Sequence, residues 1–374
     1  MRWLITLSLF TAANIAVAED AQKLLKEIKA VTREGAGNPE AQAAWKLLVS
    51  QGGESLFPTL AAMDDATPLT SNWLRSAVNA IAEKEKASGK MIPAKQLEEF
   101  VLDTKHGPVG RRLAYELLTE ADPKAPDRLL PGFINDPSGD LRRDAIAAVL
   151  PKAEADAKKD PKAALPVYEK LFEASRDQDQ AEKIAKTLKE LGGKPDLTTH
   201  FGVVNKWFIV GPFDSAKGTG FDKVYEPEKG VDLKAAYKGK DSAEVKWQPL
   251  ASEDTYGLVN FNKSIAKHMD AAAYAYTVVE SDADRPVELR FGSYCAVKIF
   301  LNGKPIYARE EYHHGERFDQ YLALGTLKKG KNELLVKVCQ NNQKDSWAQN
   351  WQFMFRICDA TGGAVPVKVV SGEK

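Results

Sequence analysis

The stretch 288–339 constrains the fold of this chain most, because strand-like runs alternate there with recognisable turns. Asn302 and Gly303 separate two such runs, and a further alternating run, 333–340, follows a turn rich in lysine and glycine. A type I′ hairpin turn requires two consecutive residues that tolerate positive φ, and an Asn-Gly pair supplies them. The pattern predicts an antiparallel β-sandwich, an architecture that often binds ligands at its loops.

Further runs with strand character lie on both sides of this stretch, and their number and spacing suit two packed antiparallel sheets. The first runs from Lys206 to the Gly211-Pro212 pair. Because proline cannot donate a hydrogen bond to a neighbouring strand, Pro305 places its strand at a sheet edge. The other predicted strands are 244–250, 255–261, 271–280, 285–292, 296–301, 304–309, 317–323, 333–340 and 350–358.

The residues before this region have a different composition. Aromatic residues are concentrated in 197–374, whereas the earlier part is rich in Ala, Leu, Lys and Glu, which favour helices. A glycine pair and a proline within 191–195 mark a helix stop and a linker. We therefore predict a helical domain, 19–193, and a sandwich domain, 194–374. The predicted helices are 20–33, 39–51, 54–63, 71–87, 95–104, 109–121, 126–135, 139–155, 161–175 and 179–191.

Three of these helices share a short pattern, an arginine with an alanine two residues later and an aliphatic residue four residues after that. A small alanine lets one helix pack closely on the next. The pattern and its spacing resemble HEAT-type repeats, which stack helix pairs into an α-solenoid. An irregular helical bundle is the alternative. The residues are Arg75, Ala77 and Ile81, then Arg112, Ala114 and Leu118, then Arg143, Ala145 and Val149.

The second half carries two patterns of a known fold. Val297, Ile299, Leu301, Asn302 and Gly303 form the first, and Leu327, Gly330, Asn332, Leu334, Val336 and Val338 form the second. They resemble the galactose-binding-like jelly-roll fold of carbohydrate-binding modules and of domains attached to some glycoside hydrolases. The resemblance implies a sandwich with a ligand site in the loops at one end. Many members of that fold also hold a structural calcium ion, so calcium stays open here, and no other cofactor is expected.

The first 18 residues and the overall charge bear on location and partners. Residues 1–18 combine Arg2, an apolar run and an Ala-Val-Ala cleavage site, which is typical of a signal peptide rather than a retained anchor. We therefore expect a secreted or periplasmic protein, with no transmembrane segment after cleavage. Lys and Arg total 52, as do Asp and Glu, which gives no electrostatic reason to expect nucleic acid as a partner. We expect Cys295, Cys339 and Cys358 to be small buried side chains.

The densest polar loop, 309–320, is the first candidate site. Its guanidinium, imidazole and carboxylate groups offer paired hydrogen bonds to sugar hydroxyls, and its tyrosine offers a face on which a sugar ring stacks. A solvated loop bonded to itself is the alternative. The two adjacent histidines diverge in a strand or a helix, so they do not easily share one zinc ion. The candidate residues are Arg309, Glu310, Tyr312, His313 and His314.

A second polar loop, 340–350, offers amides that both donate and accept hydrogen bonds. Asn341, Asn342 and Trp347 are its candidate residues, and the indole would be a flat apolar platform. Tyr294, in the loop 292–296, would join them if the resembled fold is correct. Trp351 alternates with Phe353 and Phe355 and is predicted to lie in the core.

Catalytic motifs such as a nucleophile elbow, a phosphate loop or a His-Glu-x-x-His sequence do not occur. We therefore expect a non-catalytic binding protein whose sandwich holds carbohydrate and whose helices contact a protein partner. One alternative is a scaffold without sugar binding. Another is a polysaccharide hydrolase, for which Glu310 with Glu311 or Asp282 with Asp284 are the carboxylate pairs to examine.

Overall fold

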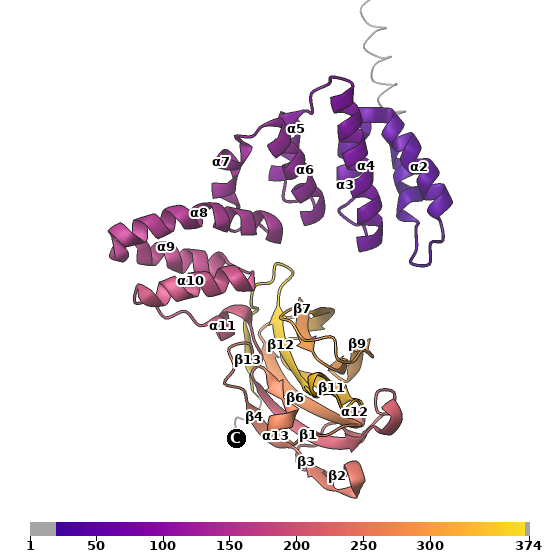
Figure 1. Cartoon of the computed structure of the whole chain (residues 1–374), viewed down its shortest axis with the longest axis vertical. Helices are drawn as coiled ribbons and strands as arrows, with labels where there is room; N and C mark the ends of the chain where they lie inside the picture. Colours follow the sequence, from indigo (N-terminus) through magenta and orange to yellow (C-terminus); the bar gives the residue numbers. More distant parts are fainter. Residues whose placement is uncertain (1–19, 371–374) are drawn as a thin grey trace, which may run out of the picture. The chain divides into compact units, whose positions relative to one another are not determined.

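The computed structural model describes residues 20–370 and divides into two compact units, Met1–Asp160 and Pro161–Lys374. Helices make up the N-terminal part and antiparallel sheets the C-terminal part, so the predicted mixed class is correct (Figure 1). The predicted signal peptide, 1–18, lies outside the described residues. Within residues 20–370, every helix is too short or too polar to cross a membrane.

The first unit consists of helices that pack mainly on their neighbours along the chain. One apolar core runs through it, and Ala77, Ala114 and Ala145 of the shared pattern are all buried in it. Residues 20–29 are helical. The helices that follow are α2 (Asn38–Gln51), η1 (Gly52–Ser55), α3 (Leu56–Ala61), α4 (Pro68–Ala87), α5 (Ala94–Leu102), α6 (Pro108–Ala121), α7 (Ala125–Leu129), η2 (Leu130–Phe133) and α8 (Gly139–Lys159).

A buried ion pair connects two of these helices. Arg111 of α6 donates two hydrogen bonds to the carboxylate of Asp136, at 2.8 and 2.7 Å, and a third to the carbonyl of Val101. Asp136 also accepts from the backbone N–H of Ser138, the residue that caps α8. Paired, bidentate geometry is what makes a buried charge tolerable. This pair therefore fixes the start of α8 relative to α6.

The second unit holds two main sheets and a small hairpin, in which all strand pairs are antiparallel. The larger sheet has the order β4-β1-β6-β11-β8-β9, with β13 also on β6, and the smaller has the order β10-β7-β12-β5. The strands are β1 (Lys206–Asp214), β2 (Ala236–Lys238), β3 (Glu244–Lys246), β4 (Gln248–Ala251), β5 (Val259–Asn260), β6 (Ala271–Ser281), β7 (Arg285–Ser293), β8 (Ala296–Leu301), β9 (Lys304–Arg309), β10 (Tyr321–Leu327), β11 (Gly330–Gln340), β12 (Gln352–Cys358) and β13 (Val367–Val369).

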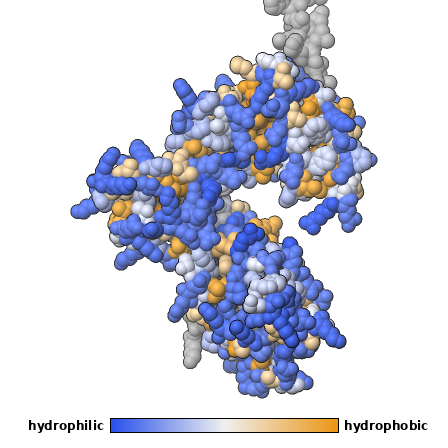
Figure 2. All heavy atoms as spheres, in the orientation of Figure 1, coloured by the Kyte–Doolittle hydropathy of each residue, from blue (hydrophilic) through white to orange (hydrophobic). Residues whose placement is uncertain are grey.

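The two sheets share an apolar core, which gives a sandwich-like arrangement. Trp207 and Trp351 lie in it, and their indole N–H groups donate to the carbonyls of Val204 and Val338 at 3.0 and 3.1 Å. Trp351 is thus a core residue, as predicted. On the face shown in Figure 2, hydrophilic residues cover most of this sandwich.

The outer face of the larger sheet is also covered. A second apolar cluster joins outward-facing residues of β1, β6, β8 and β11 to aromatic residues of the segment 215–247, among them Phe221, Tyr225 and Trp247. Burial on both faces explains why seven consecutive residues of β6, from Ala271 to Thr277, are buried instead of alternating with exposed ones.

Several local predictions are confirmed. Asn302 and Gly303 have φ angles of 52° and 74°, as the predicted turn between β8 and β9 requires. Pro305 lies on β9, at the edge of the larger sheet. The three cysteines are buried and unbridged.

Other predicted strands were wrong in their extent. The run 255–261 yields only the two residues of β5, because the Asn260 side chain caps a short helix, α13 (Phe261–Ser264). The run 244–250 is divided between β3 and β4, which belong to different sheets. The run 317–323 begins only at Tyr321, since Asp319 has a φ of 58° and leaves the extended conformation. The short strands β2 and β13 were not predicted.

The second unit begins with helices, before the predicted domain boundary between 193 and 194. They are α9 (Pro161–Ala174), α10 (Gln178–Glu190) and α11 (Leu197–Phe201), and a small helix, α12 (Glu226–Lys229), lies within the segment 215–247. Ala181 of α10 and Phe201 of α11 form an apolar cluster with Tyr256 and Phe318 of the sandwich. These contacts place α9 to α11 with the sheets.

Candidate functional site

Three connections between strands meet at one end of the sandwich. The Tyr294 hydroxyl, between β7 and β8, donates to the carbonyl of Trp347, between β11 and β12. His313, between β9 and β10, donates its backbone N–H to the carbonyl of Tyr294 at 3.0 Å. Its ring Nε2 lies 2.7 Å from Oδ1 of Asn341. The structure therefore brings together four residues from the three loops that the sequence singled out.

Trp347 is the most accessible aromatic residue of this loop cluster, with 56% of its surface exposed. It sits in a short helical turn, η5 (Ser346–Ala348), and the ring of His313 meets it edge to face at 5.9 Å. Asn342 and Lys344, in the same connection, are also exposed. An indole that contacts a neighbouring ring on one side and remains exposed to solvent is a surface on which a flat apolar group can stack.

The loop 309–320 also contains buried polar atoms that lack hydrogen-bond partners in residues 20–370. Burial raises the pKa values of both Tyr312 and Glu316. Glu316 accepts a hydrogen bond from Gln352, but its second carboxyl oxygen has no partner in residues 20–370. Nδ1 of His313 is likewise buried without a partner there. Unsatisfied buried groups are costly and are often found where a site binds something.

The remaining residues of the loop 309–320 form a separate group. His314 lies 2.8 Å from Glu311, which also pairs with Arg309, while Glu310 is exposed. The adjacent histidines thus have different partners, as the sequence predicts. Within residues 20–370, no group of three or more His, Cys, Asp and Glu side chains is placed to hold a metal ion.

Three of the four carboxylates considered for hydrolysis pair with basic side chains. Asp282 pairs with Arg285, whereas Asp284 pairs with Lys328 at 3.0 Å. Glu311 is occupied by Arg309 and His314. A glycosidase needs two carboxyl groups facing each other across a cleft, and the pairing of these side chains with basic residues does not favour that function.

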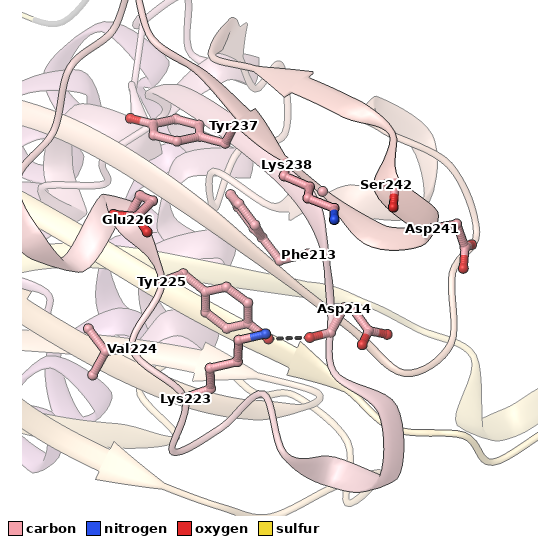
Figure 3. Close-up of a pocket in the computed structure, with 11 residues that line it drawn as sticks. Phe213, Asp214, Lys223, Val224, Tyr225, Glu226, Tyr237, Lys238, Asp241 and Ser242 are labelled. Carbon is pink, nitrogen blue, oxygen red and sulfur yellow. Dashed lines mark hydrogen bonds between the residues drawn. The ribbon is translucent and has the colours of Figure 1, made fainter.

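A pocket of about 550 Å³ was missed by the sequence interpretation. It lies beside the end of β1, under the segment 215–247 (Figure 3). Its lining residues all lie within 213–242 and carry no recognised motif, and the aromatic residues of 213–237 are the one sequence signal that they offer. They are Phe213, Asp214, Lys223, Val224, Tyr225, Glu226, Tyr237, Lys238, Gly239, Asp241 and Ser242.

Comparisons with known proteins give structural likeness only. No family model and no curated protein matches the sequence. Among solved structures, a β-glucosidase from Kluyveromyces marxianus in complex with glucose is similar at 11% identity and a TM-score of 0.27, over 42% of this chain and 17% of that one. A β-glucuronidase from Faecalibacterium prausnitzii is similar at 13% identity and a TM-score of 0.25, over 42% of this chain and 31% of that one.

The PA14 domain of the MpAFP antifreeze protein is similar at 12% identity and a TM-score of 0.20, over 46% of this chain and 65% of that one. The chain spans less than two thirds of each of these proteins. The neighbours are thus glycoside hydrolases and a domain of another kind, at low coverage, and scores this low support neither an activity nor a substrate.

Proposed function

We propose that this chain is an exported, non-catalytic binding protein whose sandwich holds carbohydrate at the loop cluster around Trp347. The observation that carries the proposal is the exposed Trp347, 56% accessible, whose backbone carbonyl accepts a hydrogen bond from Tyr294 and whose ring contacts that of His313. Sugar rings present apolar C–H faces to aromatic side chains and hydroxyl groups to amides. Both kinds of partner lie here, because Asn342 is exposed in the same connection.

The finer parts of the proposal concern architecture and partners. The sandwich would be a galactose-binding-like jelly roll, and the helices of the first unit would form a HEAT-like solenoid that contacts an extracytoplasmic protein. The buried alanines of α4, α6 and α8 support close packing of neighbouring helices. A structural calcium ion in the sandwich remains part of the proposal to be tested.

One observation favours a scaffold function without sugar binding. Leu322 and Leu324 of the edge strand β10 are 44% and 73% exposed. An edge strand with exposed leucines is suited to contact with another protein. In that case the ligand of the sandwich would be a polypeptide.

Retention of the full-length protein on a panel of immobilised polysaccharides, with and without calcium, tests the proposal. We expect retention on at least one glycan, and a loss of about fivefold in affinity for Trp347→Ala, because stacking on an exposed aromatic ring contributes about 1 kcal/mol. Leu324→Ala is the matched control, since it removes another exposed apolar side chain outside the loop cluster. Failure to bind any glycan would sink the carbohydrate proposal and leave the scaffold function.

A further inference from the structure

The pocket beside β1 has walls that the fold holds in place. Lys337, on the outer face of β11, is fully buried and donates to the carbonyls of Phe221 and Lys223 at 3.2 and 2.7 Å. Its third hydrogen bond goes to Glu228 at 2.8 Å. An ammonium group has three donors, and all three are used here to attach the segment 221–228 to the sheet.

The opposite wall is equally constrained. A Cβ atom at Gly239 would lie 2.6 Å from the carbonyl oxygen of Pro212, so only glycine allows the β2–β3 hairpin to approach β1 this closely. Asp241 and Ser242, in the turn of that hairpin, have φ angles of 53° and 65°. Residues other than glycine are strained at such positive φ angles, and the surrounding structure must hold them in that conformation. The pocket is therefore built from fixed walls.

The pocket lining contains two exposed lysines and three carboxylates, and these groups differ in their pairing. Lys223 and Lys238 form no ion pair with a carboxylate in residues 20–370, although the Lys223 ammonium lies 4.9 Å from the Tyr225 ring. Two of the carboxylates are compensated by other lysines, since Asp214 lies 4.0 Å from Lys240 and Glu226 lies 3.1 Å from Lys229. In Figure 3, the third carboxylate, that of Asp241, points away from both ammonium groups.

Aromatic side chains accompany these ammonium groups. Phe213, Tyr225 and Tyr237 line the same pocket, and the Tyr225 hydroxyl is occupied by the carbonyl of Asp214 (Figure 3). Tyr237 is only partly buried and accepts a hydrogen bond from Trp247 at 3.1 Å, which holds its ring. The pocket thus offers partly apolar walls, two ammonium groups without ion-pair partners and the hydroxyl of Ser242, beside three carboxylates, two of which pair with other lysines.

We propose that this pocket is a second ligand site, which takes an acidic sugar, that is, a sugar ring bearing a carboxylate or a sulfate. A volume of about 550 Å³ is within the usual range for small-molecule sites and suits a mono- or disaccharide. The acidic group would lie between the ammonium groups of Lys223 and Lys238, where charge-assisted hydrogen bonds are stronger than neutral ones. The ring would lie against the tyrosine wall. The inference goes beyond the loop cluster and does not depend on Trp347.

Isothermal titration of the full-length protein with digalacturonate, a monosulfated disaccharide and neutral lactose tests this site. We expect at least one acidic disaccharide to bind about tenfold or more tightly than lactose, and salt to weaken that binding. A preference between the two acidic probes distinguishes the carboxylate from the sulfate. The double variant Lys223→Met, Lys238→Met should lose the acidic preference.

The double variant Lys234→Met, Lys246→Met is the matched control, because both lysines are exposed on the same segment and neither lines the pocket. Trp347→Ala should leave binding of the acidic disaccharide unchanged. A wrong inference about this pocket can therefore be distinguished from a wrong proposal about the loop cluster around Trp347. The inference is overturned if lactose binds as tightly as the acidic probes, if no acidic probe binds at millimolar concentration, or if both double variants behave alike.

Discussion

His200 shows how one partly buried side chain connects two helices of the second unit, α11 and α9. The imidazole Nε2 of this α11 residue lies 2.9 Å from the carbonyl of Ser175, which follows α9. Its ring packs against those of Phe172 and Phe201. A carbonyl accepts a hydrogen bond, so Nε2 carries the proton and donates it. Burial, helped by the positive charges of Arg176 and Arg356, lowers the pKa of His200 to about 4.

This lowered pKa predicts a dependence of stability on pH. Between about pH 6.5 and pH 4 the unfolded chain gains a proton at His200 that the folded chain does not bind, so the free energy of unfolding falls as the pH falls. The loss is at most roughly 3 kcal/mol, and less where solvent reaches the ring. His200→Gln keeps a donor without a charge, so its urea midpoints should change less between pH 7 and pH 4.5 than those of the unmodified protein.

His314→Gln is the control for this measurement, since His314 lies on an exposed loop. Carboxylates throughout the chain also titrate in this range, and the comparison removes their common contribution. If His200→Gln and the unmodified protein lose stability in parallel, the imidazole is not responsible for the pH dependence.

The attachment of the segment 215–247 to the larger sheet depends on one lysine. Lys337 and Glu228 are both almost entirely buried, and the Tyr274 hydroxyl donates to the same carboxylate. Removing one partner of a buried ion pair leaves the other charge unpaired in a medium of low polarity. Such losses are typically larger than the contribution of the intact pair.

We therefore expect Lys337→Met to lower the free energy of unfolding by about 3–5 kcal/mol. Adding Glu228→Gln should recover part of this loss, because no charge then remains buried. Lys328→Met is the control, since its ion pair with Asp284 is exposed and should contribute no more than about 1 kcal/mol. Urea denaturation followed by tryptophan fluorescence measures all three. Equal losses in Lys337→Met and Lys328→Met would show that the buried pair does not hold the segment.

The strands and helices with strong local signals could be predicted, and those that depend on distant contacts could not. The hairpin at Asn302 and Gly303 was predictable because turn chemistry is local. The position of Trp351 followed from simple alternation. By contrast, nothing near Lys337 in sequence indicates that a segment more than one hundred residues away covers it.

The same distinction applies to the candidate sites. The three loops that meet at Trp347 are adjacent to predicted strands. The resemblance to the galactose-binding-like fold was therefore enough to predict that these loops lie at one end of the sandwich. The hydrogen bond between His313 and Asn341 could not be predicted, because it depends on the left-handed conformation of His313, with a φ of 62°. The pocket under 215–247 was not found either, since the aromatic residues Phe213, Tyr225 and Tyr237 have no recognisable spacing and form only a compositional signal.

At the scale of the molecule, α9 and α10 belong to the same compact unit as the sandwich. Three kinds of contact attach these helices. Ala181 packs in the cluster around Phe201, the Tyr256 hydroxyl bonds to Glu182, and the carbonyl of Ser175 accepts from His200. Without α9 and α10, apolar surface near Phe201 would be exposed and the partly buried imidazole of His200 would lose its acceptor.

This arrangement predicts that a fragment of residues 161–374 unfolds cooperatively, whereas a fragment of residues 194–374 is less stable by about 2–4 kcal/mol, the sum of lost apolar burial and of an unsatisfied donor. Urea denaturation of the two fragments measures the difference. Ala181→Ser in the longer fragment is a milder test, because it places a hydroxyl in the cluster around Phe201 without removing a helix. It should lower the free energy of unfolding by less than the truncation does. Equal midpoints for the two fragments would mean that the sheets fold without α9 and α10, and that the boundary near residue 193, expected from the glycine pair and the proline, describes the folding unit better than Pro161.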